Sequence, residues 1–164
     1  MNEIFLQPGE YYVGDATHRV RTILGSCVSI TLWHRKKQFG AMSHFVLATR
    51  ITPRGEAELD ARYGNEALEL MLRELAIEGV AGEDCEAKLF GGGNMFPDQP
   101  RATDRNVGWM NGEAARELMR AQGIRVVSES LYGNGHRQVI FDIRTGHVWS
   151  RQVEPKSDPQ TRKP

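Results

Sequence analysis

Apolar positions along the chain repeat every second residue in some segments and every third or fourth in others, which predicts strands and helices respectively. The clearest strand pattern covers residues 27–33, where Val28, Ile30 and Leu32 alternate with polar side chains. A polar turn separates this run from a second apolar run at residues 39–47. Two such runs joined by a short polar turn predict an antiparallel β-hairpin.

Two helices are predicted from apolar residues at helical spacing. In the first, residues 65–78, the apolar side chains from Leu68 to Leu75 fall on one face. The second begins near Asn111, a favourable N-cap residue, and ends at Gly123. Further strand-like runs are predicted at residues 11–13, 20–24, 86–90, 124–129, 138–143 and 147–153.

These elements predict a mixed α/β (α+β) fold with layered, mixed and mostly antiparallel sheets and two main flanking helices. The chain has 164 residues, which suits one domain, and we expect that domain to span residues 1–153. Residues 48–62 are polar and contain Pro53 and Gly55, so we expect a loop there. Residues 154–164 carry no apolar side chain large enough to form a core, which predicts a disordered tail.

Composition narrows the possible functions. The 21 basic and 21 acidic residues balance, so we expect no positive field for nucleic acid or anionic lipid. The two cysteines form no CxxC pair and the five histidines lack metal-ligand spacing, so we predict no metal and no cofactor. The first residues do not have the pattern of a signal peptide, and no apolar run reaches the ~20 residues that span a bilayer. We therefore expect a cytoplasmic protein without membrane insertion.

Candidate chemistry lies in the predicted hairpin, where Cys27 and His44 stand on its two strands. Opposed residues in an antiparallel pair have numbers with a constant sum, and a turn centred on residues 35–37 makes these two opposed or nearly so. An odd sum places both side chains on one face, with ~4.5–5.5 Å between opposed Cβ atoms. An even sum places them on opposite faces, and the sequence leaves both registers open.

A thiol beside an imidazole is the arrangement that cysteine-dependent acyl chemistry requires. His44 would take the proton of Cys27 and hold the ion pair, which offsets the ordinary thiol pKa of ~8.5. Gly25 and Ser26 leave backbone amides free to point, with that of Cys27, at a developing oxyanion. The alternative is that both residues are ordinary members of a small core, because free cysteine is often buried.

Two other features receive no catalytic assignment. Cys85 lies among acidic residues that disfavour a thiolate, so we expect it to be inert. The three glycines at residues 91–93 lack the lysine and hydroxyl of a phosphate loop. We interpret them as a close approach of backbone segments beside the cleft.

Several sequence blocks occur in an order and at a spacing that is specific as a set. They are residues 22–28, 40–45, 63–67, 88–95, 105–108, 135–137 and 145–146. Together they resemble the CheD family of chemoreceptor glutamine deamidases, over about residues 5–153. The first two blocks, around Cys27 and His44, resemble the catalytic blocks of that family.

The resemblance implies roles for three residues: Cys27 as nucleophile, His44 as general base, and Thr22 as the third catalytic group. It implies hydrolytic deamidation of glutamine side chains to glutamate, through a cysteine thioester, on the cytoplasmic helical region of methyl-accepting chemotaxis receptors. It also implies a fold like that of toxin-type cysteine deamidases and a CheC-type chemotaxis phosphatase as a second partner. Two alternatives stay open: a docking module without turnover, and a cysteine amidohydrolase acting on another amide.

Overall fold

The computed structural model describes residues 1–97 and 107–154. Within these residues it contains nine strands, two α-helices and one short 3-10 helix, Gly82–Asp84. The strands are β1 (Asn2–Leu6), β2 (Tyr11–Gly14), β3 (His18–Leu24), β4 (Val28–His34), β5 (Phe39–Ser43), β6 (Glu86–Gly91), β7 (Arg125–Leu131), β8 (His136–Asp142) and β9 (Val148–Val153). The helices are α1 (Gly64–Ile77) and α2 (Val107–Gln122).

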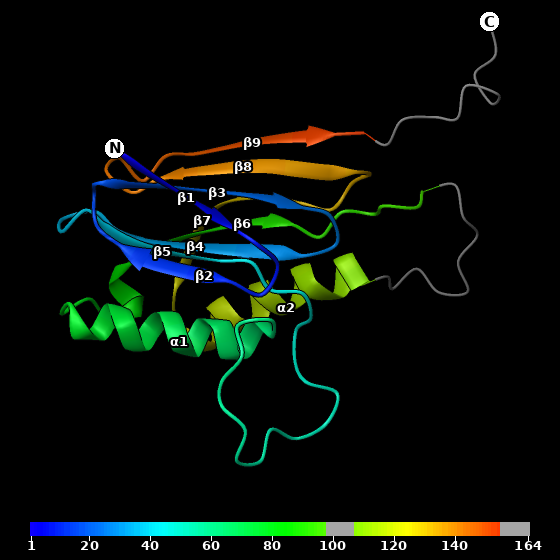
Figure 1. Cartoon of the computed structure of the whole chain (residues 1–164), viewed down its shortest axis with the longest axis horizontal. Helices are drawn as coiled ribbons and strands as arrows, with labels where there is room; N and C mark the ends of the chain where they lie inside the picture. Colours follow the sequence, from blue (N-terminus) through cyan, green and yellow to red (C-terminus); the bar gives the residue numbers. More distant parts are fainter. Residues whose placement is uncertain (98–106, 155–164) are drawn as a thin grey trace, which may run out of the picture.

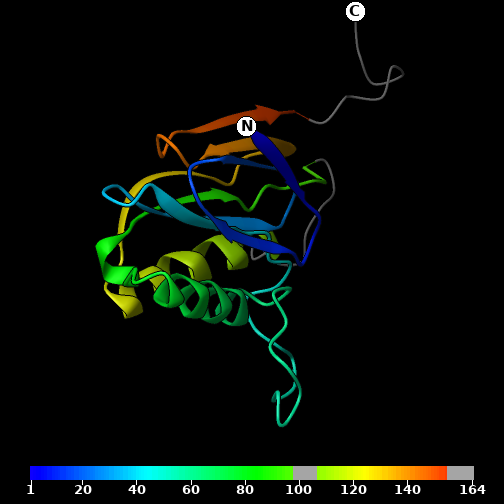
Figure 2. The same ribbon diagram turned by 60° about the vertical axis from the view of Figure 1, so that its left-hand side comes forward.

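The elements form three layers. One sheet has the strand order β1-β3-β8-β9, and the second has the order β2-β5-β4-β6-β7. The second sheet lies between the first sheet and the two helices (Figure 1), and the layering persists when the molecule is turned (Figure 2). Strands β1 and β3 pair in parallel, as do β6 and β7, whereas the other described pairs are antiparallel. The predicted fold class is confirmed.

Strand β4 is buried on both faces because it lies at the centre of the middle layer. Val28, Ile30 and Leu32 join a core with apolar residues of α1 and α2. The alternate side chains face the first sheet, where Ser29 donates a hydrogen bond to the Ser43 carbonyl at 2.6 Å. The alternating sequence pattern therefore marks a fully buried strand whose polar side is hydrogen-bonded.

The hairpin and α1 form where the sequence predicts them, although β5 ends at Ser43 and the apolar run continues beyond it. The prediction that the second helix begins at Asn111 is wrong. Helix α2 begins at Val107, and Asn111 is 1% exposed within it. Its amide binds carbonyls of two other segments instead of capping its own helix. Strand β1 has no counterpart among the predicted strands, and residues 155–164 of the predicted tail lie outside the described residues.

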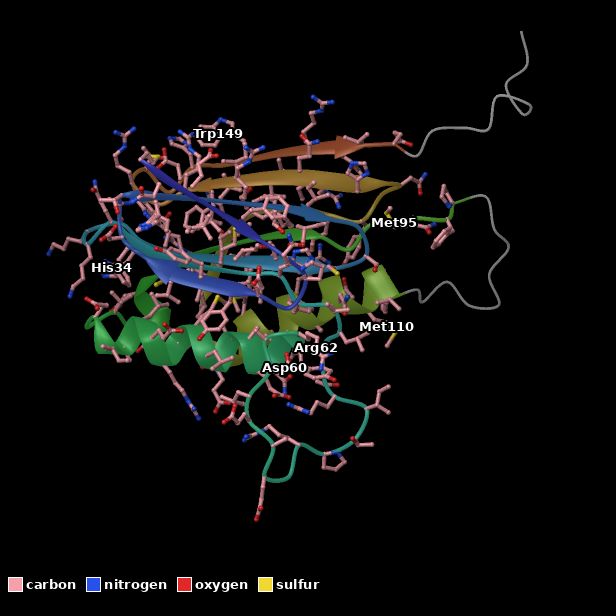
Figure 3. All side chains as sticks on the ribbon, in the orientation of Figure 1. His34, Asp60, Arg62, Met95, Met110 and Trp149 are labelled. Carbon is pink, nitrogen blue, oxygen red and sulfur yellow. The ribbon has the colours of Figure 1, made fainter. Side chains whose placement is uncertain are left out.

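Residues 48–62 form a loop, as predicted, and a buried carboxylate fastens this loop to α1. Glu66 accepts hydrogen bonds from Arg50 Nε at 2.6 Å and Arg50 Nη2 at 3.0 Å. It also accepts one from the Asp60 amide at 2.9 Å. Figure 3 shows Asp60 and Arg62 at the base of the loop, beside the start of α1. The loop is therefore attached at both of its ends to one helix turn.

Candidate active site

Thr22, Cys27 and His44 lie in segments that meet at one end of the two sheets. Thr22 belongs to β3, Cys27 lies in the turn between β3 and β4, and His44 directly follows β5. Thr22 and His44 are each 2% exposed, and Cys27 is partly exposed. The chain crosses from the first sheet to the second through the turn that carries the cysteine.

The hairpin register places Cys27 and His44 on the same face. Strands β4 and β5 pair with Thr31 opposite Met42, which is a register with an odd sum. Alternation therefore directs both side chains toward the first sheet. Cys27 packs against the core between the sheets, and His44 bonds to Thr22 of β3. Of the two registers that the sequence allows, the structure has the one that a Cys–His pair requires.

The strand ladder is rearranged immediately before His44. The amide of Ile30 donates to the hydroxyl of Ser43 at 3.2 Å, and the Ser43 carbonyl accepts from the Ser29 hydroxyl. The backbone of His44 bonds to the opposite side, its amide donating to the Glu10 carbonyl at 3.0 Å. These bonds fix the chain on both sides of the imidazole.

The Thr22 hydroxyl determines which nitrogen of His44 carries the proton. It donates its one hydrogen to the Leu6 carbonyl at 2.8 Å. Its oxygen, 2.6 Å from His44 Nδ1, must then accept from an N–H at that position. The imidazole therefore carries its hydrogen on Nδ1 and leaves Nε2 as the proton acceptor. Because Nδ1 is bonded to Thr22 of the first sheet, Nε2 is left to accept a proton, and the hairpin register places Cys27 on the same face as this imidazole.

Burial keeps both groups uncharged at neutral pH. It lowers the pKa of His44 to about 4, against weaker opposing effects from the Leu6 carbonyl and the Glu10 carboxylate. It raises the pKa of Cys27 above its ordinary value, and the residue's own amide partly offsets this. The expected resting thiolate–imidazolium pair is therefore disfavoured, because desolvation penalises both charged forms.

The turn that carries Cys27 is held through three consecutive carbonyls. The Gly25 carbonyl accepts from the Gly93 amide and the Cys27 carbonyl from the Gly92 amide, each at 2.9 Å. The Ser26 carbonyl accepts from the side chain of Asn111 at 3.1 Å. Within the described part of the chain, neither the Ser26 amide nor the Cys27 amide donates to another residue, and the Cys27 amide lies beside its own sulfur. These two amides can therefore donate to a negatively charged oxygen.

The predicted close approach of residues 91–93 is confirmed. Gly91 has φ +111°, and a Cβ atom there would lie 2.2 Å from the Cys27 carbonyl oxygen. Its own carbonyl accepts from Nη1 of Arg137, a 2% exposed arginine of β8, at 2.8 Å. A side chain at Gly91 would displace the turn that carries Cys27, so the glycine is required for the geometry of the site.

Cys85 does not belong to this site. It is 3% exposed in the core on the helix side of the middle sheet. Burial, together with the charges of Asp84 and Glu83, raises its pKa to about 12. Among residues 1–97 and 107–154, no three His, Cys, Asp or Glu side chains are grouped as a metal site would require. No described helix is long and apolar enough to cross a membrane.

Apolar side chains line a small pocket next to the turn that carries Cys27. A pocket of about 200 Å³ opens beside Ser26, lined in part by Met95 and Phe96, which are 37% and 65% exposed. Met110 is 53% exposed, and Figure 3 shows Met95 and Met110 at the same end of the molecule. A larger hollow of about 650 Å³ beside β1 does not include Cys27. The pocket beside the turn that carries Cys27 is therefore small and is lined in part by exposed apolar side chains.

Sequence reasoning missed three groups that position the site: the Leu6 carbonyl, Ser43 and Asn111. The Leu6 carbonyl has no sequence signal, because any residue there supplies one. Ser43 adjoins His44, but its role depends on the strand register. Asn111 carries a signal that favours a helix cap, and only the packed fold shows its bonds to other segments.

Most of the chain, and not only the candidate site, is similar to known proteins. A family model described as "CheD chemotactic sensory transduction" matches residues 46–152. A protein of Albidiferax ferrireducens named "Probable chemoreceptor glutamine deamidase CheD 2" is 59% identical over 153 residues, which cover 93% of this chain and 88% of that protein. The chain belongs to the CheD family.

Other members of the CheD family cover nearly the whole chain. "Probable chemoreceptor glutamine deamidase CheD 1" of Chromobacterium violaceum is 41% identical over 162 residues, which cover 97% of this chain and 83% of that protein. "Probable chemoreceptor glutamine deamidase CheD 3" of Dechloromonas aromatica is 42% identical over 149 residues, which cover 91% of this chain and 86% of that protein. The family model begins after His44, so the similarity of the segment that carries Thr22, Cys27 and His44 comes from these relatives.

Proposed function

We propose that the protein hydrolyses glutamine side chains of chemoreceptors to glutamate, with Cys27 as the nucleophile. The names of its relatives support the reaction and the substrate. The observation that carries the mechanism is the hydrogen bond between Thr22 and His44, which leaves Nε2 as a base on the face of Cys27. Thr22 thus has the orienting role that a carboxylate or amide has in other catalytic triads.

The first half of the reaction forms a thioester. The Cys27 sulfur attacks the carboxamide carbon while its proton passes to Nε2 of His44. The Ser26 and Cys27 amides stabilise the tetrahedral oxyanion. When the C–N bond breaks, the imidazolium returns the proton to the leaving nitrogen, and ammonia departs.

The second half restores the enzyme. His44, neutral again, takes a proton from a water molecule as its oxygen attacks the thioester carbonyl. The C–S bond breaks, the sulfur recovers the proton from the imidazolium, and the product is a glutamate side chain. One water is consumed and one ammonia is released per turnover, with no change of oxidation state.

The surface at the site supports a protein substrate rather than a small amide. The adjoining pocket holds about 200 Å³, and its exposed apolar rim includes Met95 and Phe96. A rim of this kind packs against apolar side chains that flank a glutamine on a helix. We infer that the substrate is the cytoplasmic helical region of the receptor, and that the protein acts in the cytoplasm. A CheC-type phosphatase that docks on the same rim would compete with the receptor.

The test compares Cys27→Ala with the wild-type protein and a matched Cys85→Ala control. Each is incubated with the cytoplasmic fragment of a receptor from the same organism, and peptides are mapped by mass spectrometry. Wild type and Cys85→Ala should convert glutamine to glutamate, a mass increase of ~1 Da, and Cys27→Ala should convert none. Turnover retained by Cys27→Ala would refute covalent catalysis. Binding of the fragment without turnover by the wild type would favour a docking module.

A further inference from the structure

Asn111 joins three parts of the molecule through one side-chain amide. It lies in α2, and its Nδ2 donates to the Ser26 carbonyl at 3.1 Å and to the Val46 carbonyl at 2.8 Å. Its side chain is buried, with 1% of the residue exposed. Ser26 directly precedes the nucleophile Cys27, and Val46 follows His44 by two residues. A residue of the helix layer therefore holds the segments that carry both catalytic groups.

The two segments have no backbone bond to each other at this level. The β4–β5 ladder ends at the bridge between Val28 and Phe45. Beyond it the Val46 and Leu47 amides both donate to the Arg62 carbonyl, which lies in the loop before α1. The strands diverge there, and the Asn111 amide bonds to both of them, at the Ser26 carbonyl and the Val46 carbonyl.

We propose that Asn111 is a positioning residue that sets the separation of the nucleophile turn from the histidine segment. The inference rests on the proposed function, since it concerns proton transfer from Cys27 to His44. Asparagine suits this role because its planar NH₂ group supplies two donors in fixed directions. Aspartate has the same shape but would face two carbonyl oxygens with no hydrogen to donate. A misplacement of ~1 Å between reacting groups costs up to ~100-fold in rate.

A purely structural role for Asn111 predicts lower stability with unchanged chemistry at the cysteine. The matched control is Met119→Ala, in the same helix. Met119 is fully buried in the helix-side core, and its side chain has no part in the site. Met119→Ala should lower the free energy of unfolding by about 2–5 kcal/mol without affecting the reactivity of Cys27.

The experiment measures the rate of Cys27 alkylation by iodoacetamide across pH, with modified peptides mapped and Cys85 as the internal reference. Asn111→Asp and Asn111→Ala should slow alkylation of Cys27 by about tenfold or more, to the rate and pH profile of His44→Ala. Asn111→Asp combined with His44→Ala should be no slower than His44→Ala alone. With receptor fragment, kcat should fall about 10- to 100-fold while KM changes less than about twofold.

Asn111→Gln keeps the amide and should recover part of the alkylation rate, which keeps the test decisive if Asn111→Asp does not fold. The proposal is overturned if folded Asn111 variants alkylate at the wild-type rate. It is also overturned if Met119→Ala slows alkylation as much as Asn111→Ala does. A wild-type protein that fails to deamidate, but whose Cys27 reactivity depends on His44 and Asn111 together, would refute the proposed substrate and leave the positioning role supported.

Discussion

At the scale of single residues, the decisive property of His44 is that it is buried and neutral. A pKa near 4 means that the imidazole binds a proton only in acid, so the base form is present throughout the neutral range. We therefore expect kcat/KM to change by no more than about twofold between about pH 5.5 and pH 7, where an ordinary histidine would titrate. Receptor-fragment deamidation measured across this range tests it.

As a control for this prediction, circular dichroism at each pH shows whether the protein is still folded. If kcat/KM falls about tenfold between pH 7 and pH 5.5 while the fold is intact, the histidine has an ordinary pKa in the free enzyme. The site would then be more hydrated than its buried imidazole indicates.

Ser43 is the second residue with a specific expected effect. Ser43→Ala removes the acceptor for the buried Ile30 amide, which should lower the free energy of unfolding by about 1–3 kcal/mol. It should also lower kcat, because the segment that presents His44 loses its fixed conformation. Urea titration and deamidation kinetics measure the two effects.

The matched control is Thr31→Val, which removes a buried hydroxyl of the paired strand β4 without touching the histidine segment. The Thr31 hydroxyl donates to the Lys88 carbonyl at 3.4 Å. This variant should lose stability and keep kcat. Equal losses of kcat in Thr31→Val and Ser43→Ala would mean that the β4–β5 hairpin as a whole, and not Ser43, orients His44.

The sequence is sufficient to propose Thr22, Cys27 and His44 as site residues, but it does not reveal the groups that hold them in place. The three side chains have chemistry of their own, and their blocks carry the family resemblance. Ser43 and Asn111 act through single hydrogen bonds to carbonyls and amides of other segments. Such bonds depend on register and packing, which residue type does not determine.

At the scale of elements, periodicity located the hairpin and α1 well because both have regular apolar spacing. It failed for β1, which is five residues long and mostly exposed. The prediction also failed at the start of α2, because a residue with a strong N-cap preference can instead donate a side-chain hydrogen bond to another segment, as Asn111 does. Tertiary hydrogen bonds therefore overrode a local signal.

The contact between α1 and the loop at residues 48–62 leads to a prediction of stability against pH. Arg50 lowers the pKa of Glu66 below its ordinary 4.5, so the folded state favours the ionised carboxylate. That stabilisation is complete above pH 4.5 and is lost as the pH falls through the lower folded-state value. Glu66→Gln should therefore be less stable than wild type at pH 7, with the difference shrinking in acid. Urea midpoints at pH 7 and about pH 4 measure it.

Glu69→Gln is the control for the Glu66 prediction. Glu69 lies on an exposed part of the same helix and pairs with Arg73, so its removal should change the midpoint little at either pH. A difference between Glu66→Gln and wild type that stays constant from pH 7 to pH 4 would contradict ionisation as the cause. It would instead indicate a loss of packing.

At the scale of the whole molecule, the assignment of strands to two sheets could not be predicted. Strands β3 and β4 are neighbours in the chain but lie in different sheets, and β3 pairs with the distant β8. Neighbouring strands usually pair with each other, so chain order predicts the wrong partner for β3. This crossing is what brings Thr22 of one sheet to His44 of the other.

The two cores share the middle sheet, so we expect cooperative unfolding of all three layers. Met71→Ala in α1 opens the helix-side core, and Phe141→Ala in β8 opens the core between the sheets. Each should lower the free energy of unfolding by about 2–5 kcal/mol. Fluorescence of the buried Trp33 reports on the core between the sheets, and far-UV circular dichroism reports on the helices. In both variants the two signals should change in one coincident transition.

The control is Ile51→Ala, whose side chain is 93% exposed and should leave the transition unchanged. A Met71→Ala protein that loses helical signal before the Trp33 signal would contradict cooperativity and define the helices as a separate unit. That result would also affect the proposed active site, because the Asn111 amide, which bonds to the segments of Cys27 and His44, belongs to α2. Activity should then disappear with the helical signal, whereas a cooperative fold loses activity and both signals together.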